Sequence, residues 1–279
     1  MAYCQHNHYK QPIVLILDSG FGGLSIYNVV RKISPYCCYL YVFDNEYFPY
    51  GERPETFIIQ RVISIIKTVC KMHHLDLAII ACNTISVVSL QVLKMYFAFP
   101  IVGVIPEIEL ASQYTKNGII GVLATYRTIQ HGYTINLVRR FLYQYTVFLL
   151  SSVKLVKLAE SKFYKDCIIN SEVKNILDPW LKLKNLPDTI VLGCTHFSLL
   201  KKELKSVFPT NTCLIDSEHY FGNYIKYLLN KYLKDRFMYN HISCNQNIAY
   251  CTIDTSNILR LRLILLSNYN FFCLKTLSI

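Results

Sequence analysis

This sequence has no stretch that could anchor it in a membrane or direct it to secretion. None of its apolar runs approaches the roughly 18 residues that a membrane-spanning helix needs. Its N-terminus, MAYCQHNHYKQ, lacks the apolar central region of a secretory signal peptide. We therefore expect a soluble protein that acts in the cytoplasm.

Charged residues are few. Hydrophobic residues make up 52% of the chain and charged residues 17%, which excludes a disordered protein. At 279 residues the chain can bury a large core, and this length favours two domains over one. The net charge of +11 suits anionic metabolites or nucleic acid. The basic residues are dispersed, however, and the abundance of Lys, Ile, Asn, Tyr and Phe is what AT-rich coding would produce, so the charge is a weak indication of a partner.

The eleven cysteines lack the paired spacing of a disulfide framework or a zinc site. Their number is odd and no C-x-x-C motif occurs, so we expect free thiols in a reducing cytoplasm. Cys4, His6 and His8 could form a loose metal clip, but no fourth ligand accompanies them. The sequence therefore predicts no metal site.

A phosphate-binding loop is also missing. The first apolar run, residues 13–17, ends in a glycine-rich turn that reads D-S-G-F-G-G and begins at Asp18. This turn matches neither G-x-G-x-x-G nor G-x-x-x-x-G-K-[ST], and its aspartate would repel phosphate, so we expect no nucleotide cofactor. An aspartate at the carboxyl end of a strand, followed by glycines that admit a ligand to the backbone, instead indicates a substrate site.

A regular alternation of strands and helices is present along the chain. Short apolar runs predict buried strands at residues 13–17, 39–43, 77–81, 101–105, 119–123, 147–150 and 189–192. Helical patterns separate them, which indicates an α/β fold with mainly parallel sheets. We expect two similar, doubly wound lobes that face each other across a central cleft. Residues 12–103 with 217–279 would form the first lobe and 104–216 the second, with a final strand and helix ending near residues 272–277.

A weak internal repeat links the two predicted lobes. The run L-A-I-I-A leads into Cys82, and the run T-I-V-L-G leads into Cys194. An aspartate, Asp76 or Asp188, stands six positions before each cysteine, and a threonine and a serine follow each one. Such self-similarity predicts two equivalent structural units. The two cysteines would then lie at equivalent strand ends and approach one cleft from opposite sides.

Cys82 alone would more often be an inert buried thiol than a reactive one. Two facing thiols have a chemical use, because inversion of a stereocentre next to a carboxylate needs a base on one face and an acid on the other. A free thiol has a pKa of about 8.5, so each needs a neighbouring group that takes or lends a proton. Asp18 is the expected partner of Cys82, and His196 that of Cys194.

Four motifs follow one another in order along nearly the whole chain. They are D-S-G-F-G-G-L at 18–24, P-Y-G at 49–51, A-C-N-T at 81–84 and G-C-T-H-F at 193–197. Together these motifs resemble the glutamate racemases, and the segments VGVIP, LAESK, DPWLKLK and NIAYC resemble the enterobacterial branch of that family. The resemblance implies a cofactor-independent isomerase that interconverts L- and D-glutamate and supplies D-glutamate for peptidoglycan of the cell wall.

Position by position, the resemblance also implies roles for residues of this chain. Cys82 would deprotonate D-glutamate and Cys194 would deprotonate L-glutamate. Asp18 and His196 would assist them as acid–base groups, with Glu160 near the second thiol. Other positions match substrate-contacting residues of the family: Ser19, Pro49, Tyr50, Gly51, Asn83, Thr84, Thr125 and Thr195.

The chain departs from the family pattern outside the catalytic positions. Ile85 and Val87 replace residues that are usually smaller, and Ser198 stands where proline usually follows G-C-T-H-F. Residues 230–246 have no clear counterpart. The N-terminal extension that carries sensing of a cell-wall precursor in the enterobacterial branch is short, so an effector of that kind stays open.

Two other interpretations remain. A related two-cysteine racemase could act on aspartate or another small acid, because the scaffold motifs do not fix the length of the substrate. A binding role is the second, since some relatives in this branch are associated with inhibition of DNA gyrase, and the positive charge would favour a complex near DNA. The sequence does not decide between a monomer and a homodimer.

Overall fold

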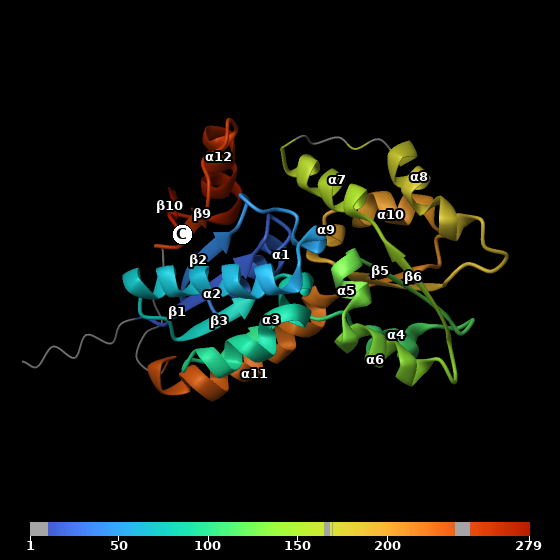
Figure 1. The fold of residues 1–279 in the computed structure, drawn as a ribbon, viewed down its shortest axis with the longest axis horizontal. Helices are drawn as coiled ribbons and strands as arrows, with labels where there is room; N and C mark the ends of the chain where they lie inside the picture. Colours follow the sequence, from blue (N-terminus) through green and yellow to red (C-terminus); the bar gives the residue numbers. More distant parts are fainter. Residues whose placement is uncertain (1–10, 165–167, 169, 238–245) are drawn as a thin grey trace, which may run out of the picture.

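The computed structural model describes residues 11–164, 168, 170–237 and 246–279 (Figure 1). Cys4, His6 and His8, the loose metal clip considered above, lie outside the described residues. Within the described ranges, no group of three or more His, Cys, Asp or Glu side chains could hold a metal ion. No helix in this part of the chain is both long and apolar enough to cross a membrane.

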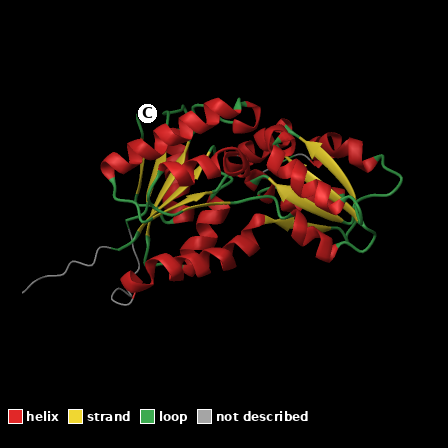
Figure 2. Cartoon of the chain, turned by 60° about the horizontal axis from the view of Figure 1, so that its bottom comes forward, coloured by secondary structure: helices red, strands yellow, loops and turns green. Residues whose placement is uncertain are grey.

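Two parallel sheets, each with helices on both faces, form two lobes that lie side by side (Figures 1 and 2). The first sheet has six strands in the order β10-β9-β2-β1-β3-β4. Its strands are β1 Ile13–Asp18, β2 Cys38–Phe43, β3 Leu77–Ile80, β4 Ile101–Gly103, β9 Ile248–Cys251 and β10 Cys273–Thr276. Its helices are α1 Leu24–Ile33, η1 Tyr50–Glu52, α2 Glu55–Met72, α3 Asn83–Tyr96, α11 Ser217–Phe237 and α12 Ile258–Tyr269.

Alternation along each strand divides the first lobe's core in two. Val14 and Ile16 of β1 face α1, α11 and α12, whereas Leu15 and Leu17 face α2 and α3. Because both faces of the sheet are covered, the central strands are apolar throughout, as a buried parallel sheet requires. Only their carboxyl ends are free to present polar side chains.

The second sheet has four strands in the order β6-β5-β7-β8. Its strands are β5 Ile119–Ala124, β6 Thr146–Ser151, β7 Thr189–Gly193 and β8 Cys213–Asp216. Its helices are α4 Ile108–Tyr114, α5 Tyr126–Gln130, α6 Gly132–Phe141, α7 Val153–Tyr164, α8 Asn170–Leu181, α9 Thr195–Ser198 and α10 Lys201–Val207. Apolar side chains of α7 to α10 pack on one face of this sheet, and those of α4 and α6 on the other.

The strand order repeats between the lobes. Strands β2-β1-β3-β4 of the first sheet correspond, in the same spatial order, to strands β6-β5-β7-β8 of the second. The repeated aspartates have matching roles, because each accepts hydrogen bonds from backbone N–H groups next to the neighbouring strand. Asp76 Oδ2 accepts from Ile13 N at 2.9 Å, and Asp188 Oδ2 accepts from Lys116 N at 2.7 Å. The two lobes are therefore similar units, as the sequence predicts.

Several local predictions were wrong. The chain ends in strand β10, not in a helix, because β10 pairs in parallel with β9 at the edge of the first sheet. After β5 the sequence pattern predicts one helix that runs to about residue 141. The structure has two helices, since the chain breaks at His131, whose side chain caps α6 by accepting from Tyr133 N. Helix α4 and strand β8 were not predicted, because their hydrophobic patterns are too short to indicate a helix or a strand.

Seven cysteines of the described residues are free thiols, including Cys82 and Cys194. Cys38 is disulfide-bonded, contrary to the expectation of free thiols throughout.

Candidate active site

Cys82 and Cys194 stand at equivalent strand ends. Each follows a buried central strand, β3 or β7, and each is the N-cap residue of the next helix, α3 or α9. Their side chains are 6% and 7% exposed, so both thiols lie in the interior. The carboxyl ends of the two sheets face each other. Cys194 is therefore near enough to Cys82 for its charge to raise the pKa of Cys82. The structure thus brings together the two thiols that the repeat singles out.

Asp18 and Ser19 lie beside Cys82 at the end of strand β1. Ser19 Oγ is 3.8 Å from Cys82 Sγ, and the fully buried Asp18 carboxyl lies close enough to this thiol for its charge to raise the pKa of Cys82. The Asp18 carboxyl is held by backbone N–H groups of Ser19, at 2.6 Å, and Gly23, at 2.5 Å. The glycine-rich turn therefore orients this carboxyl toward the thiol.

His196 and Glu160 lie beside Cys194. His196 Nδ1 is 3.9 Å from Cys194 Sγ, and its Nε2 is 2.7 Å from Glu160 Oε2. Glu160, on α7, also accepts a hydrogen bond of 3.3 Å from Phe21 N in the glycine-rich turn of the first lobe. The imidazole is thus fixed between a thiol and a carboxylate, and that carboxylate touches both lobes.

The buried groups have shifted proton affinities. Burial raises the pKa of Asp18, against the charge of His196 and the Gly23 and Ser19 N–H groups, which lower it. Burial and the Asp18 charge raise the pKa of Cys82 well above its usual range. Burial alone would lower the pKa of His196, but its hydrogen bonds to Cys194 and Glu160 and their charges raise it well above the ordinary value. The site therefore favours a neutral Cys82 thiol and a protonated His196.

The glycine-rich turn packs directly on the second lobe. A Cβ atom on Gly22 would lie 2.6 Å from both the backbone N and the Nδ1 of His196. A Cβ atom on Gly20 would lie 2.8 Å from His196 Nε2 and 3.0 Å from Glu160 Oε2. Glycine is required at these positions by close approach, and the lobes are closed on each other around the two thiols.

The P-Y-G motif forms a second contact between the lobes. A Cβ atom on Gly51 would lie 2.7 Å from Thr125 Cβ, so the start of η1 touches the end of β5. Tyr50 is fully buried and its hydroxyl donates to Asp44, so this side chain is already engaged within the first lobe. Arg61 binds the same Asp44 carboxylate through two hydrogen bonds, at 2.9 and 3.0 Å.

The remaining predicted substrate residues are buried beside the thiols. Thr84 Oγ1 of α3 is 2.9 Å from Thr125 Oγ1, across the contact between the lobes. The amide of Asn83 and the hydroxyl of Thr195 are buried and make no hydrogen bond within the described part of the chain. Buried polar atoms without partners are costly, so these groups are candidates to bind a polar ligand.

Sequence reasoning missed residues that hold these groups in place. The ring of Phe48 lies 5.3 Å from the imidazole of His196, centroid to centroid, and Thr128 Oγ1 is 2.9 Å from Thr125 Oγ1. Asp44 anchors the P-Y-G segment through Tyr50 and Arg61. Asp44 could have been found from the sequence, because it directly follows a predicted strand, as Asp18 does. Phe48 and Thr128 have no feature in the sequence that distinguishes them from ordinary core residues.

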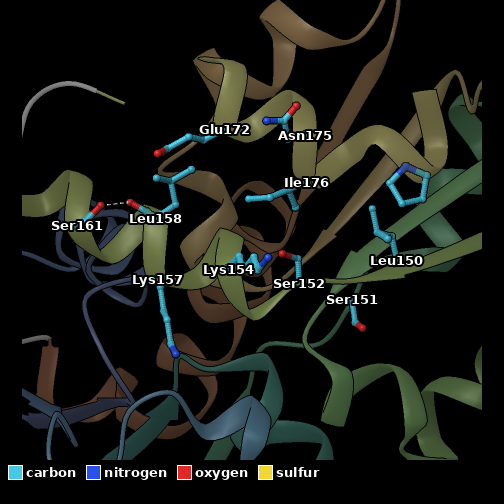
Figure 3. Close-up of a pocket in the computed structure, with 11 residues that line it drawn as sticks. Leu150, Ser151, Ser152, Lys154, Lys157, Leu158, Ser161, Glu172, Asn175 and Ile176 are labelled. Carbon is cyan, nitrogen blue, oxygen red and sulfur yellow. Dashed lines mark hydrogen bonds between the residues drawn. The ribbon is translucent and has the colours of Figure 1, made fainter. Parts of the chain in front are cut away.

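A cavity of about 770 Å³ lies elsewhere, on the second lobe between the end of β6, α7 and α8 (Figure 3). Its lining includes Lys154 and Lys157 of α7 and Glu172 and Asn175 of α8. None of the predicted site residues lines it. The cavity is therefore separate from the two thiols.

Comparisons with known proteins agree with this geometry. The family model for Asp/Glu/hydantoin racemases matches residues 25–219. A glutamate racemase of Salmonella paratyphi A is 44% identical over 269 residues, which are 96% of this chain and 93% of the relative. One from Pectobacterium atrosepticum is 43% identical over 270 residues, which are 97% of this chain and 93% of the relative.

Solved structures show the same similarity. A crystal structure of Escherichia coli glutamate racemase, in complex with L-glutamate and the activator UDP-MurNAc-Ala, has a TM-score of 0.87 and 41% identity and covers 96% of this chain and 99% of its own. A glutamate racemase from Bacillus anthracis has a TM-score of 0.80 at 25% identity and covers 97% of this chain and 98% of its own.

Proposed function

The chain belongs to the glutamate racemase family, within the Asp/Glu/hydantoin racemases, and we propose that it interconverts L- and D-glutamate through Cys82 and Cys194. The observation that carries this proposal is the placement of the two thiols at equivalent strand ends of facing sheets. The enzyme is an isomerase that needs no cofactor, and we expect it to work in the cytoplasm and to supply D-glutamate for the cell wall.

In the L-to-D direction, Cys194 acts as the base. His196, protonated between Glu160 and Cys194, places a positive charge 3.9 Å from Cys194 Sγ, where it stabilises a thiolate. The thiolate removes the α-proton of L-glutamate, and the electron pair of the broken C–H bond spreads into the substrate's α-carboxylate. The product of this step is a planar intermediate with the proton on Cys194.

Cys82 then acts as the acid on the opposite face. Burial and Asp18 keep it as the neutral thiol, which is the form that can donate a proton to the intermediate. The new C–H bond gives D-glutamate and leaves a thiolate at Cys82, hydrogen-bonded to Ser19 and close to Asp18. In the D-to-L direction the two thiols exchange roles.

The unpaired polar groups support the placement of the substrate between the thiols. Asn83 and Thr195 follow Cys82 and Cys194 directly, and their buried polar atoms have no hydrogen-bond partner among the described residues. The two carboxylates of glutamate are acceptors that the Asn83 amide, the Thr195 hydroxyl and backbone N–H groups of the turns can satisfy. A precursor of the cell wall as effector is a further proposal, which rests on the activator in the Escherichia coli complex.

The test is racemisation in deuterated water. The protein should interconvert the enantiomers, seen by circular dichroism, while the α-proton signal of glutamate is lost from the NMR spectrum. Cys82→Ala and Cys194→Ala should each reduce racemisation by about 10³-fold or more. Cys70→Ala, which removes an exposed free thiol, is the matched control and should leave the rate unchanged.

Each cysteine variant should retain half of the chemistry. Cys82→Ala keeps the thiol that faces L-glutamate, so it should exchange the α-proton of the L-enantiomer without inverting it. Cys194→Ala should do the same with D-glutamate. A folded wild-type protein that neither racemises nor exchanges glutamate would refute the proposed function, and full activity in either variant would refute the two-thiol mechanism.

A further inference from the structure

Three buried hydroxyl groups meet where the two lobes touch. Thr84 belongs to α3 of the first lobe, and Thr125 and Thr128 belong to the start of α5 in the second. Their Oγ1 atoms are 2.9 Å apart for Thr84 and Thr125, 2.9 Å for Thr125 and Thr128, and 3.3 Å for Thr84 and Thr128. Each hydroxyl is therefore within hydrogen-bonding distance of the other two, in a closed triangle that bridges the lobes.

Thr128 differs from the other two. It has no exposed surface, whereas Thr84 and Thr125 are each 3% exposed, and its backbone N–H also donates to Thr125 Oγ1 at 3.3 Å. A hydroxyl group has one proton to donate and two lone pairs to accept with. If the Thr128 hydroxyl and its N–H both donate to Thr125 Oγ1, they occupy both lone pairs, and the proton of Thr125 must point elsewhere.

We propose that Thr128 is a positioning residue, which turns the hydroxyl protons of Thr125 and Thr84 toward the substrate carboxylate when the lobes close. This inference rests on the proposed function, because it needs glutamate between the two lobes. Without the Thr128 hydroxyl, Thr125 Oγ1 would regain a free lone pair, Thr84 would donate to it, and the Thr84 proton would be lost to the substrate.

The surrounding structure makes this arrangement specific. Helix α5 packs against α3 and against η1, and Gly51 approaches Thr125 so closely that the side chain of Thr125 has little freedom to turn. Thr128 can therefore change only the directions in which the hydroxyl protons of Thr84 and Thr125 point, and not the positions of their side chains. Because these hydroxyls bind a carboxylate and not the α-proton, their loss affects substrate binding in the ground state and the transition state alike.

The experiment compares steady-state kinetics of four variants with the wild type. Thr128→Val removes the hydroxyl at nearly constant volume and should raise the KM for both enantiomers about tenfold, with kcat within about twofold. Thr128→Ser should return KM to near the wild-type value. Thr128→Ala should resemble Thr128→Val, and the Ser and Ala pair isolates the hydroxyl even if the valine variant folds poorly.

Thr134→Val is the matched control. Thr134 is also a buried threonine of the second lobe, but its hydroxyl makes no hydrogen bond within the described residues, so its loss should leave KM unchanged. An unchanged KM in folded Thr128→Val, or a KM equally raised in the Ser and Ala variants, would overturn the positioning role. A wild type that does not racemise glutamate would overturn the proposed function, and this inference with it.

Discussion

At the scale of single residues, the hydrogen bonds that His196 makes to Cys194 and to Glu160 raise the pKa of this imidazole. The imidazole is 2% exposed and the carboxylate 15%, so water screens their interaction little. The raised pKa of His196 means that the interactions of the protonated imidazole stabilise the fold fully below the unfolded histidine value of about 6.5. That contribution is lost as the pH rises through the folded pKa.

Glu160→Gln should therefore weaken the fold most in mildly acidic solution. We expect a loss of about 2 kcal/mol in the free energy of unfolding near pH 6, measured by denaturant titration and shrinking as the pH rises. The alkaline limb of kcat/KM should move to lower pH, because imidazolium then loses its proton more easily. Glu203→Gln is the control: Glu203 is 13% exposed and pairs with Lys162, away from the thiols. A limb that does not move in Glu160→Gln would contradict this role.

The two thiols and the groups proposed to assist them could be found from the sequence, whereas residues that act only through contacts with other side chains were missed. Cys82 and Cys194 stand out because they recur after matching strands. The resemblance then adds Glu160, which lies far from Cys194 in the sequence. Thr128 and Phe48 act through distances of a few ångströms to other side chains, and no periodic pattern encodes such contacts.

At the scale of elements, the glycine-rich turn between β1 and α1 joins the two lobes. It holds the Asp18 carboxyl through two of its backbone N–H groups, donates to Glu160 from Phe21 N, and lies against His196. The turn therefore positions groups on both sides of the site. The absence of side chains at Gly20 and Gly22 is what permits this approach.

Gly22→Ala should disable the enzyme while leaving the fold intact. The added methyl group would lie 2.6 Å from the backbone N of His196, which cannot rotate away, so the turn and the second lobe must separate. A displacement of about 1 Å at a catalytic group can reduce the rate about 100-fold, which is the loss we expect in kcat/KM. Gly132→Ala is the matched control, because no atom of the described ranges lies within 4 Å of its Cβ position. An active Gly22→Ala variant would show that the turn is not held against His196 during turnover.

The elements themselves were predictable where their apolar pattern is long. Strands β1, β3, β5 and β7 are continuous apolar runs, and the structure has them close to their expected positions. Helix α3 begins at Asn83, earlier than its hydrophobic pattern, because the motif residues after Cys82 already form its first turn. Strand β8 was missed because four residues beside β7 carry no alternation that would separate them from a loop.

At the scale of the whole molecule, the two lobes match in register but not in chemistry. Leu17 pairs with Ile80 in the first sheet as Leu123 pairs with Leu192 in the second, so Ser19 and Thr125 occupy equivalent positions. By the same register, Thr84 is equivalent to His196. Asp18, the proposed acid–base partner of Cys82, is thus on a neighbouring strand, whereas His196, the proposed partner of Cys194, is on the helix that Cys194 caps. The repeat predicts the positions of the thiols, but not this asymmetry.

The closed arrangement should make lobe motion part of turnover. The thiols, Asp18 and His196 are all buried, so substrate and product can pass only when the lobes separate. We expect the kcat of the wild type to fall as sucrose raises the viscosity of the solution. Glu160→Gln, slowed at the chemical step, should show little dependence on viscosity. A wild-type kcat that is independent of viscosity would mean that opening is faster than proton transfer.

Burial of the two thiols has a consequence for the enzyme between substrates. In the proposed mechanism, each conversion leaves Cys194 with the proton that it took and Cys82 without the one that it gave, or the reverse. Both cysteine residues are more than nine-tenths buried. The proposed mechanism therefore predicts that the empty enzyme retains the protonation state set by the enantiomer that it converted last. Each opening of the lobes lets water exchange protons with the thiols and reset that state.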